Sequence, residues 1–154
     1  MTPIETEKYC FLRLYQKDLS DASHSLSMLK RFNERDVRQA LIRDTAIIYA
    51  RPFSGNQGNL VKKHFLSLKH VPKSFRVLHD QLISLRNEHF AHCSLKANQP
   101  VLNETDSGFE IVSIMTRAIV NYDAILNCEA DIAELIAAVE KSVVTDLLEI
   151  HSRI

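Results

Sequence analysis

Apolar residues recur at helical spacing through most of this chain, in series separated by polar or turn-forming residues. The first series follows Thr2, Pro3 and Glu5, which suit the N-cap, the first and the third positions of a helix. It continues to about residue 32, and a second series spans 37–51, where a following proline disfavours further helix. The pattern therefore predicts two long helices in the first third of the chain.

A third apolar series leads into the most unusual cluster of polar residues. Its members alternate at spacings of four and three residues, as on one face of an amphipathic helix: Val71, Phe75, Leu78, Leu82 and Leu85. The same spacing continues to His89 and His92, so both imidazoles are predicted on the buried side of this helix, at its C-terminal end. Arg86 and Asn87 come just before them.

The remaining segments are more mixed. Residues 60–70 admit a short helix, and turn-rich stretches enclose apolar pairs that favour a small β-hairpin or an irregular insertion at about 100–114. Residues 114–122 fit either a helix or extended chain, and a last apolar series predicts a helix from about Asp123 to the end. The economical prediction is an all-α chain, a single domain over 1–154, folded as a bundle of about four or five helices.

The composition disfavours some classes of function but does not identify one. The 154 residues are 45% apolar and 25% charged with a net charge of zero, so no overall basic field favours DNA or a membrane surface. The three cysteines, Cys10, Cys93 and Cys128, lack the paired spacing of zinc modules or disulfide frameworks, which fits a reducing, cytoplasmic setting. We expect no signal peptide and no transmembrane helix, because no suitable apolar run is present.

Charge is uneven along the chain although its sum is zero. Residues 61–79 hold five basic side chains, three histidines and no acid, whereas 123–150 hold seven acids and one lysine. One interpretation is that these are two solvent-exposed faces with opposite excess charge. The other is that the basic segment, through Lys73 and Arg76, contacts a phosphate backbone. Arg51, at the predicted end of the second helix, fits either a partner of the helix dipole or a further phosphate contact.

Arg86 and His92 are the residue types that phosphate chemistry needs. Arginine offers a fixed fork of donors to phosphate oxygens, and histidine exchanges protons near neutral pH. Six positions apart, they point about 120° away from each other on a straight α-helix, so a single copy makes a thin site. Two copies packed about a twofold axis would bring both pairs into one cleft. Such a centre needs no metal and no cofactor if the 2′-hydroxyl of RNA is the attacking group.

The stretch around these residues resembles the signature of HEPN domains (higher eukaryotes and prokaryotes nucleotide-binding domains), nearest an abortive-infection-like branch. Arg86 is followed by the polar Asn87, and five residues separate Arg86 from His92, near the end of a long helix. The resemblance covers this helix specifically and the rest of the chain only as a helical bundle. It implies a homodimer and metal-independent RNA cleavage that leaves a 2′,3′-cyclic phosphate, in toxin or phage-defence biology, with a partner antitoxin such as a nucleotidyltransferase.

Carried over residue by residue, the resemblance assigns Arg86 to stabilising the developing phosphorane, His92 to acid or base catalysis, and Asn87 to orienting the phosphate. His89 is not part of that pattern, and its spacing alone places it beside the site as a substrate contact.

Each of these residues also has a structural interpretation. The two histidines would be core side chains that donate to backbone carbonyls, Arg86 would pair with an acid of the last helix, and Asn87 would satisfy a backbone group. A metal held by His89, His92 and Cys93 is disfavoured because no further ligand is near in the sequence. The alternative function is therefore a non-catalytic helical dimer that binds a nucleotide or a partner protein.

Overall fold

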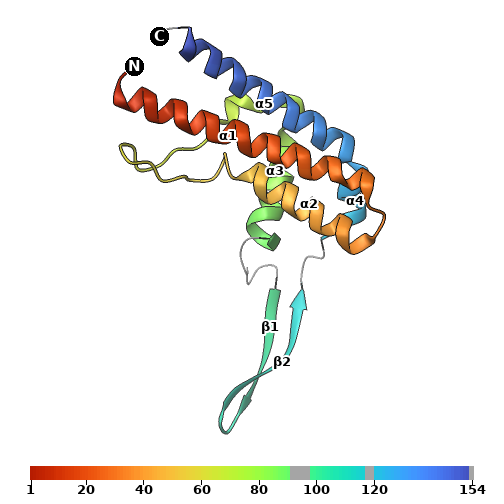
Figure 1. Cartoon of the computed structure of the whole chain (residues 1–154). Coiled ribbons are helices and arrows are strands. Elements are labelled where there is room, and N and C mark those ends of the chain that lie inside the picture. Colours follow the sequence, from red (N-terminus) through yellow and green to blue (C-terminus); the bar gives the residue numbers. More distant parts are fainter. Residues whose placement is uncertain (91–97, 117–119, 153–154) are drawn as a thin grey trace.

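The computed structural model describes residues 1–90, 98–116 and 120–152, with the backbone alone for 98–102 and 109–116. Within these residues lie five α-helices: α1 (Pro3–Ser27), α2 (Arg35–Ala50), α3 (Arg76–Leu85), α4 (Tyr122–Asn127) and α5 (Glu129–His151). A β-hairpin separates α3 from α4 and projects away from the helices (Figure 1). Its strands are β1 (Asn98–Thr105) and β2 (Gly108–Thr116). The predicted helical bundle is confirmed, and of the two alternatives for the insertion, a hairpin or an irregular segment, the structure has the hairpin.

The start of α1 follows the sequence prediction closely. Thr2 Oγ1 accepts a hydrogen bond from the Glu5 amide at 3.3 Å, and the Glu5 carboxylate accepts one from the Thr2 amide at 2.7 Å. This capping box satisfies backbone donors that the first helical turn leaves unpaired. At its other end α1 passes into a 3₁₀ turn, Met28–Arg31. Arg38 of α2 donates to the Leu29 carbonyl there at 2.6 Å, which closes the connection between the two helices.

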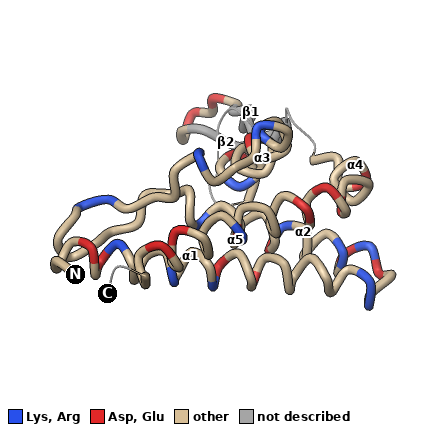
Figure 2. The backbone as a smooth tube through the Cα atoms, turned by 90° about the horizontal axis from the view of Figure 1, so that it is seen from above, with Lys and Arg blue, Asp and Glu red and all other residues tan. Residues whose placement is uncertain are grey.

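α1, α2 and α5 build most of the core. α1 and α5 lie side by side and antiparallel, α2 returns along α1, and α3 crosses on the far side of this layer (Figures 1 and 2). Fully buried side chains come from all four helices, among them Leu19, Ile42, Tyr49, Leu82, Leu135 and Val139. Burying an aliphatic side chain of this size contributes about 1.5–3 kcal/mol before chain entropy is subtracted, so this layer fixes the frame on which α3 is held.

Residues 51–75 connect α2 to α3 as a long irregular segment, which we call the connecting segment. Its regular structure among the described residues is limited to single 3₁₀ turns at Leu68–His70 and Lys73–Phe75 and to a backbone bridge between Asn56 and His64. The short helix that the pattern admitted over 60–70 is therefore wrong except for one turn. α3 also begins later than predicted, because Lys73–Phe75 forms a 3₁₀ turn rather than α-helix.

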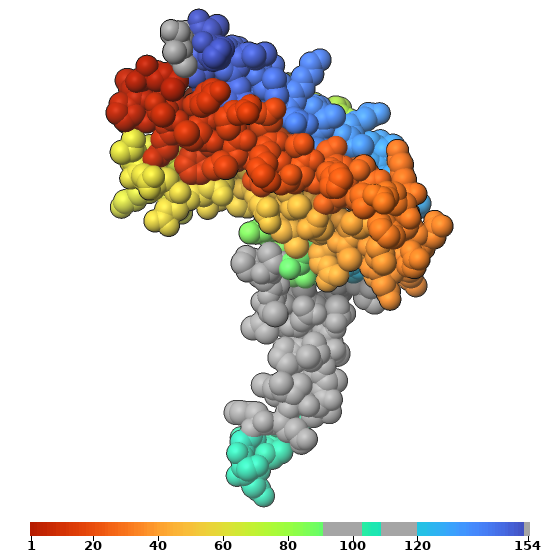
Figure 3. All heavy atoms as spheres, in the orientation of Figure 1, coloured from red at the N-terminus to blue at the C-terminus, as the bar shows by residue number. Residues whose placement is uncertain are grey.

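Glu7 of α1 fastens the connecting segment to the bundle. Its carboxylate accepts hydrogen bonds at 2.8–3.0 Å from three consecutive backbone amides, those of Asn59, Leu60 and Val61. His64 Nε2 lies 2.6 Å from Glu7 Oε1. These bonds, with the Val61 amide contributing most, lower the pKa of Glu7 to about 2. Figure 3 shows the segment in yellow packed against the N-terminal part of α1, with α5 in blue along the other side.

The hairpin turns tightly at its tip. Gly108 has φ +129°, a backbone conformation that a residue with a Cβ rarely adopts, and Thr105 Oγ1 donates to the Gly108 carbonyl at 3.0 Å. β1 and β2 pair antiparallel along their whole length, with one register shift after Val101. Such a shift bends and twists a two-stranded ribbon.

The last helix of the sequence prediction is two helices. Asn121 caps α4 by accepting a hydrogen bond from the Ala124 amide at 3.0 Å, and Cys128, with φ −96° and ψ 14°, separates α4 from α5. The prediction of one uninterrupted helix from about Asp123 is therefore wrong at Cys128. This break lets α4 lie opposite α3, where the two helices border a groove.

Candidate functional site

α3 does not end as an ordinary α-helix. Its backbone widens into a single π-helical turn, Arg86–Phe90, which we call the π-turn and which holds every described residue of the predicted motif. Such turns insert an extra residue into the helical repeat and occur frequently at functional sites. The predicted acid–base residue His92 lies in 91–97, outside the described residues.

Arg86 is half-buried, and the following residue holds its guanidinium. Arg86 Nη1 donates to the Oδ1 atom of the exposed Asn87 at 2.8 Å. In the described part of the chain no carboxylate lies within ion-pair distance of Arg86, so the predicted alternative of a pair with the last helix is not seen there. One bond to a neutral amide leaves the charge and most of the guanidinium donors for phosphate oxygens.

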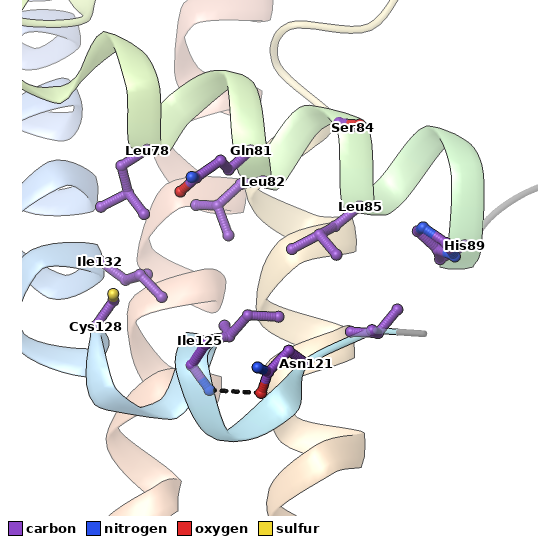
Figure 4. A pocket seen from close by; sticks show the side chains of 12 residues that line it. Leu78, Gln81, Leu82, Ser84, Leu85, His89, Asn121, Ile125, Cys128 and Ile132 are labelled. Atoms are coloured by element: carbon purple, nitrogen blue, oxygen red, sulfur yellow. Dashed lines mark hydrogen bonds between the residues drawn. The ribbon is translucent and has the colours of Figure 1, made fainter. Parts of the chain in front are cut away.

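His89 lies at one end of a groove between α3 and α4. The groove encloses about 410 Å³ and is lined mainly by apolar side chains, including Leu78, Leu82, Leu85, Ile125 and Ile132. Figure 4 shows the side chains of the two helices facing each other across it, with His89 beyond Leu85. The predicted register of His89 with the apolar stripe is confirmed. The imidazole is half-buried and makes no hydrogen bond to any described residue.

A buried hydrogen bond fixes α3 against α2 two turns before Arg86. Tyr49 Oη and His79 Nδ1 lie 2.8 Å apart, and both side chains are almost fully buried. The Phe53 ring meets the His79 ring edge-on, with centroids 4.5 Å apart. Burial lowers the pKa of His79 and raises that of Tyr49, so both groups stay neutral near pH 7. This pair is the rigid support on which α3 presents the π-turn.

The other predicted substrate contacts lie elsewhere. Arg76 donates through Nε and Nη2 to two backbone carbonyls of the connecting segment, at 3.0 and 2.6 Å, so it braces the turn before α3. Arg51 caps the end of α2 and lies 3.5 Å from the Asp18 carboxylate. Lys73 is exposed in its 3₁₀ turn. Of the four predicted substrate contacts, His89 is the one that borders the groove in the described ranges.

The sequence pattern did not predict a second cluster of ionisable side chains, around His70. His70 Nδ1 lies 2.9 Å from Ser142 Oγ, and its Nε2 lies 3.5 Å from Asp146 Oδ2. Burial lowers the pKa of His70. The imidazole and the hydroxyl are separated by 72 positions, so no local motif could have joined them.

Two further observations bear on the class of protein. Among the described residues, no three His, Cys, Asp or Glu side chains are grouped as metal ligands, and no described helix combines the length and apolarity that a membrane span requires. Comparison with protein-family models, curated proteins and solved structures finds no match for this chain. The HEPN resemblance therefore rests on the motif residues and on the helical architecture.

Proposed function

We propose that this chain is a metal-independent endoribonuclease of the HEPN kind that acts as a homodimer. The observation that carries the proposal is Arg86, held on a π-turn by a neutral amide, with no described acid to neutralise it. A guanidinium in this state is suited to a phosphate, because its planar fork of donors matches the phosphate oxygens. Asn87 and His89 lie in the same turn and offer further polar groups.

The proposed reaction uses the RNA as its own nucleophile. The 2′-hydroxyl oxygen attacks the adjacent phosphorus, and the bond to the 5′-oxygen of the next nucleotide breaks. His92 of one copy takes the 2′-hydroxyl proton, and His92 of the other gives a proton to the leaving 5′-oxygen. Arg86 stabilises the charge on the non-bridging oxygens during the transfer. The products are a 2′,3′-cyclic phosphate and a free 5′-hydroxyl.

A second candidate function is supported by the groove itself. Its mainly apolar lining suits a helix of a partner protein or the base of a nucleotide better than a sugar–phosphate backbone. The chain would then be a non-catalytic helical dimer, with Arg86 contacting an anionic group of the bound molecule. In a toxin or defence role, a nucleotidyltransferase acting as antitoxin is a partner that both functions allow.

The two functions are separated by cleavage assays on the purified chain with total RNA in the presence of EDTA. We expect Arg86→Ala and His92→Ala each to slow cleavage by about 10²–10³-fold while the elution volume of the dimer is unchanged. Arg43→Ala and His24→Ala are matched controls, because both residues are exposed on other helices, and they should cleave at the wild-type rate. Failure of the wild-type chain to cleave any RNA would favour the binding function.

A further inference from the structure

A second cleft lies between α1, residues 63–70 of the connecting segment and α5, and it shares no lining residue with the groove beside the π-turn. Its floor is apolar and is formed by Phe11, Leu12, Tyr15 and Leu66. Ile4 and Phe65 stand at its rim with 58% and 64% of their surface exposed. Large apolar side chains exposed beside a cleft are typical of a surface that binds something.

The aromatic part of the floor is held in place. The Phe11 ring stacks on the His64 imidazole, with centroids 4.1 Å apart and planes inclined by 16°. The Tyr15 ring lies 5.9 Å from Phe11 and is tilted by 40°. His64 is itself held by Glu7, so the stack is fixed rather than adaptable. The exposed part of this stack is a preformed surface for an apolar body.

The lining of the cleft also carries basic side chains. Lys69 Nζ lies 2.9 Å from Asp146 Oδ2. This ion pair neutralises Asp146, the one acidic residue among the described residues that line the cleft. Lys8 and His70 line the same cleft. Lys8 forms no ion pair with any described residue, so the lining keeps an excess of positive charge.

We infer that this cleft binds a small organic anion. Its planar apolar body lies along Phe11 and Phe65, and its phosphate or carboxylate group meets Lys8, whose charge Asp146 does not neutralise. An apolar floor selects a hydrophobic body, and an unpaired ammonium group selects an anionic group. A nucleic-acid strand fits less well, because its phosphates would also run across the apolar rim. This inference is independent of the ribonuclease proposal, since the cleft contains no residue of the motif.

Isothermal titration calorimetry on the full chain tests the inference with defined probes. We expect 1-naphthyl phosphate to bind one-to-one and saturably, and both 1-naphthol and inorganic phosphate to bind at least about tenfold more weakly, because each lacks one half of the recognition. Titration with 1-naphthoate shows whether the anionic group is read as a phosphate or as any carboxylate-like charge.

Exposed side chains provide variants that keep the fold. Phe65→Ala should weaken binding of 1-naphthyl phosphate by about threefold to tenfold, and Lys8→Gln by up to about fivefold. Val77→Ala and Lys30→Gln are the matched controls, exposed and outside the cleft, and should bind like the wild type. Absence of saturable binding, or equal loss in targets and controls, would overturn the inference. So would a single-stranded RNA that binds more tightly than the probe and depends on the same two residues.

Discussion

Tyr49→Phe removes a single oxygen from the support that holds the motif helix. In the wild type this oxygen lies 2.8 Å from His79 Nδ1, between two nearly fully buried rings. Phenylalanine keeps the aromatic volume and the contact with Phe53, whose ring centroid lies 5.4 Å away, so no cavity is opened. The substitution therefore tests the hydrogen bond and little else.

The expected size follows from leaving His79 Nδ1 buried without its partner, which costs about 1–3 kcal/mol. Unfolding entropy is about 2.1 cal/mol/K per residue, so 154 residues give roughly 0.3 kcal/mol/K. A loss of about 2 kcal/mol then lowers Tm by about 6 °C. RNA cleavage should fall as well if the π-turn depends on this support for its position.

Thermal unfolding followed by circular dichroism measures the effect. Tyr9→Phe is the matched control, because Tyr9 packs partly buried against the core and makes no hydrogen bond to a described residue. Its Tm should stay within about 1 °C of the wild type. A Tyr49→Phe chain that melts with the wild type, or a Tyr9→Phe chain that loses as much, would refute the assigned role of the buried pair.

Three further predictions concern the connecting segment and pH. Gly58→Ala should lower the unfolding free energy in urea by about 1–3 kcal/mol, because the added Cβ would lie 2.6 Å from the Val61 carbonyl oxygen. Gly55→Ala is the control and should leave the unfolding free energy unchanged, because the atom nearest to its added Cβ is 3.8 Å away. The lowered pKa of Glu7 makes its contribution complete above pH 4.5 and lost as pH falls toward 2. The protection factors of the segment's amides, which are corrected for the intrinsic pH dependence of exchange, should therefore fall at pH 3 in the wild type and be low already at pH 7 in Glu7→Gln; identical protection in both proteins at pH 7 would contradict this. Burial lowers the pKa of His79 in the folded chain. As the pH falls, the unfolded chain therefore takes up this proton before the folded chain does. The contribution of His79 to stability is complete above about pH 6.5 and decreases below it. The unfolding free energy should therefore be lower at pH 5.5 than at pH 7.5, with a smaller difference in His79→Gln; a difference of the same size in that variant would assign the effect elsewhere.

Local patterns were enough to predict most of the helices. The capping box at Thr2, the end of α2 before Pro52 and the hairpin all depend on residues within a few positions of one another. The connecting segment was not predictable in this way, because Glu7 binds amides more than 50 positions along the chain. The burial of His70 and His79 was not predictable either, because they lie in a basic stretch whose composition is typical of a solvent-exposed surface.

The candidate site was predictable in part. The spacing of the apolar stripe placed His89 beside the leucines of α3, and the structure confirms this. The π-turn had no signal in the pattern, since a shift in backbone hydrogen bonding leaves the order of apolar residues unchanged. The hydrogen bond between Arg86 and Asn87 was also not predictable from the pattern, because it depends on the side-chain conformations within that turn.

The most direct test of the central proposal is the chemistry of the RNA ends. Total RNA incubated with the wild-type chain in EDTA should yield fragments that carry a 2′,3′-cyclic phosphate and a free 5′-hydroxyl, and the Arg86→Ala chain should yield almost none. Fragments with 3′-hydroxyl ends, or equal cleavage by the two proteins, would contradict a reaction in which the RNA 2′-hydroxyl attacks while Arg86 holds the phosphate.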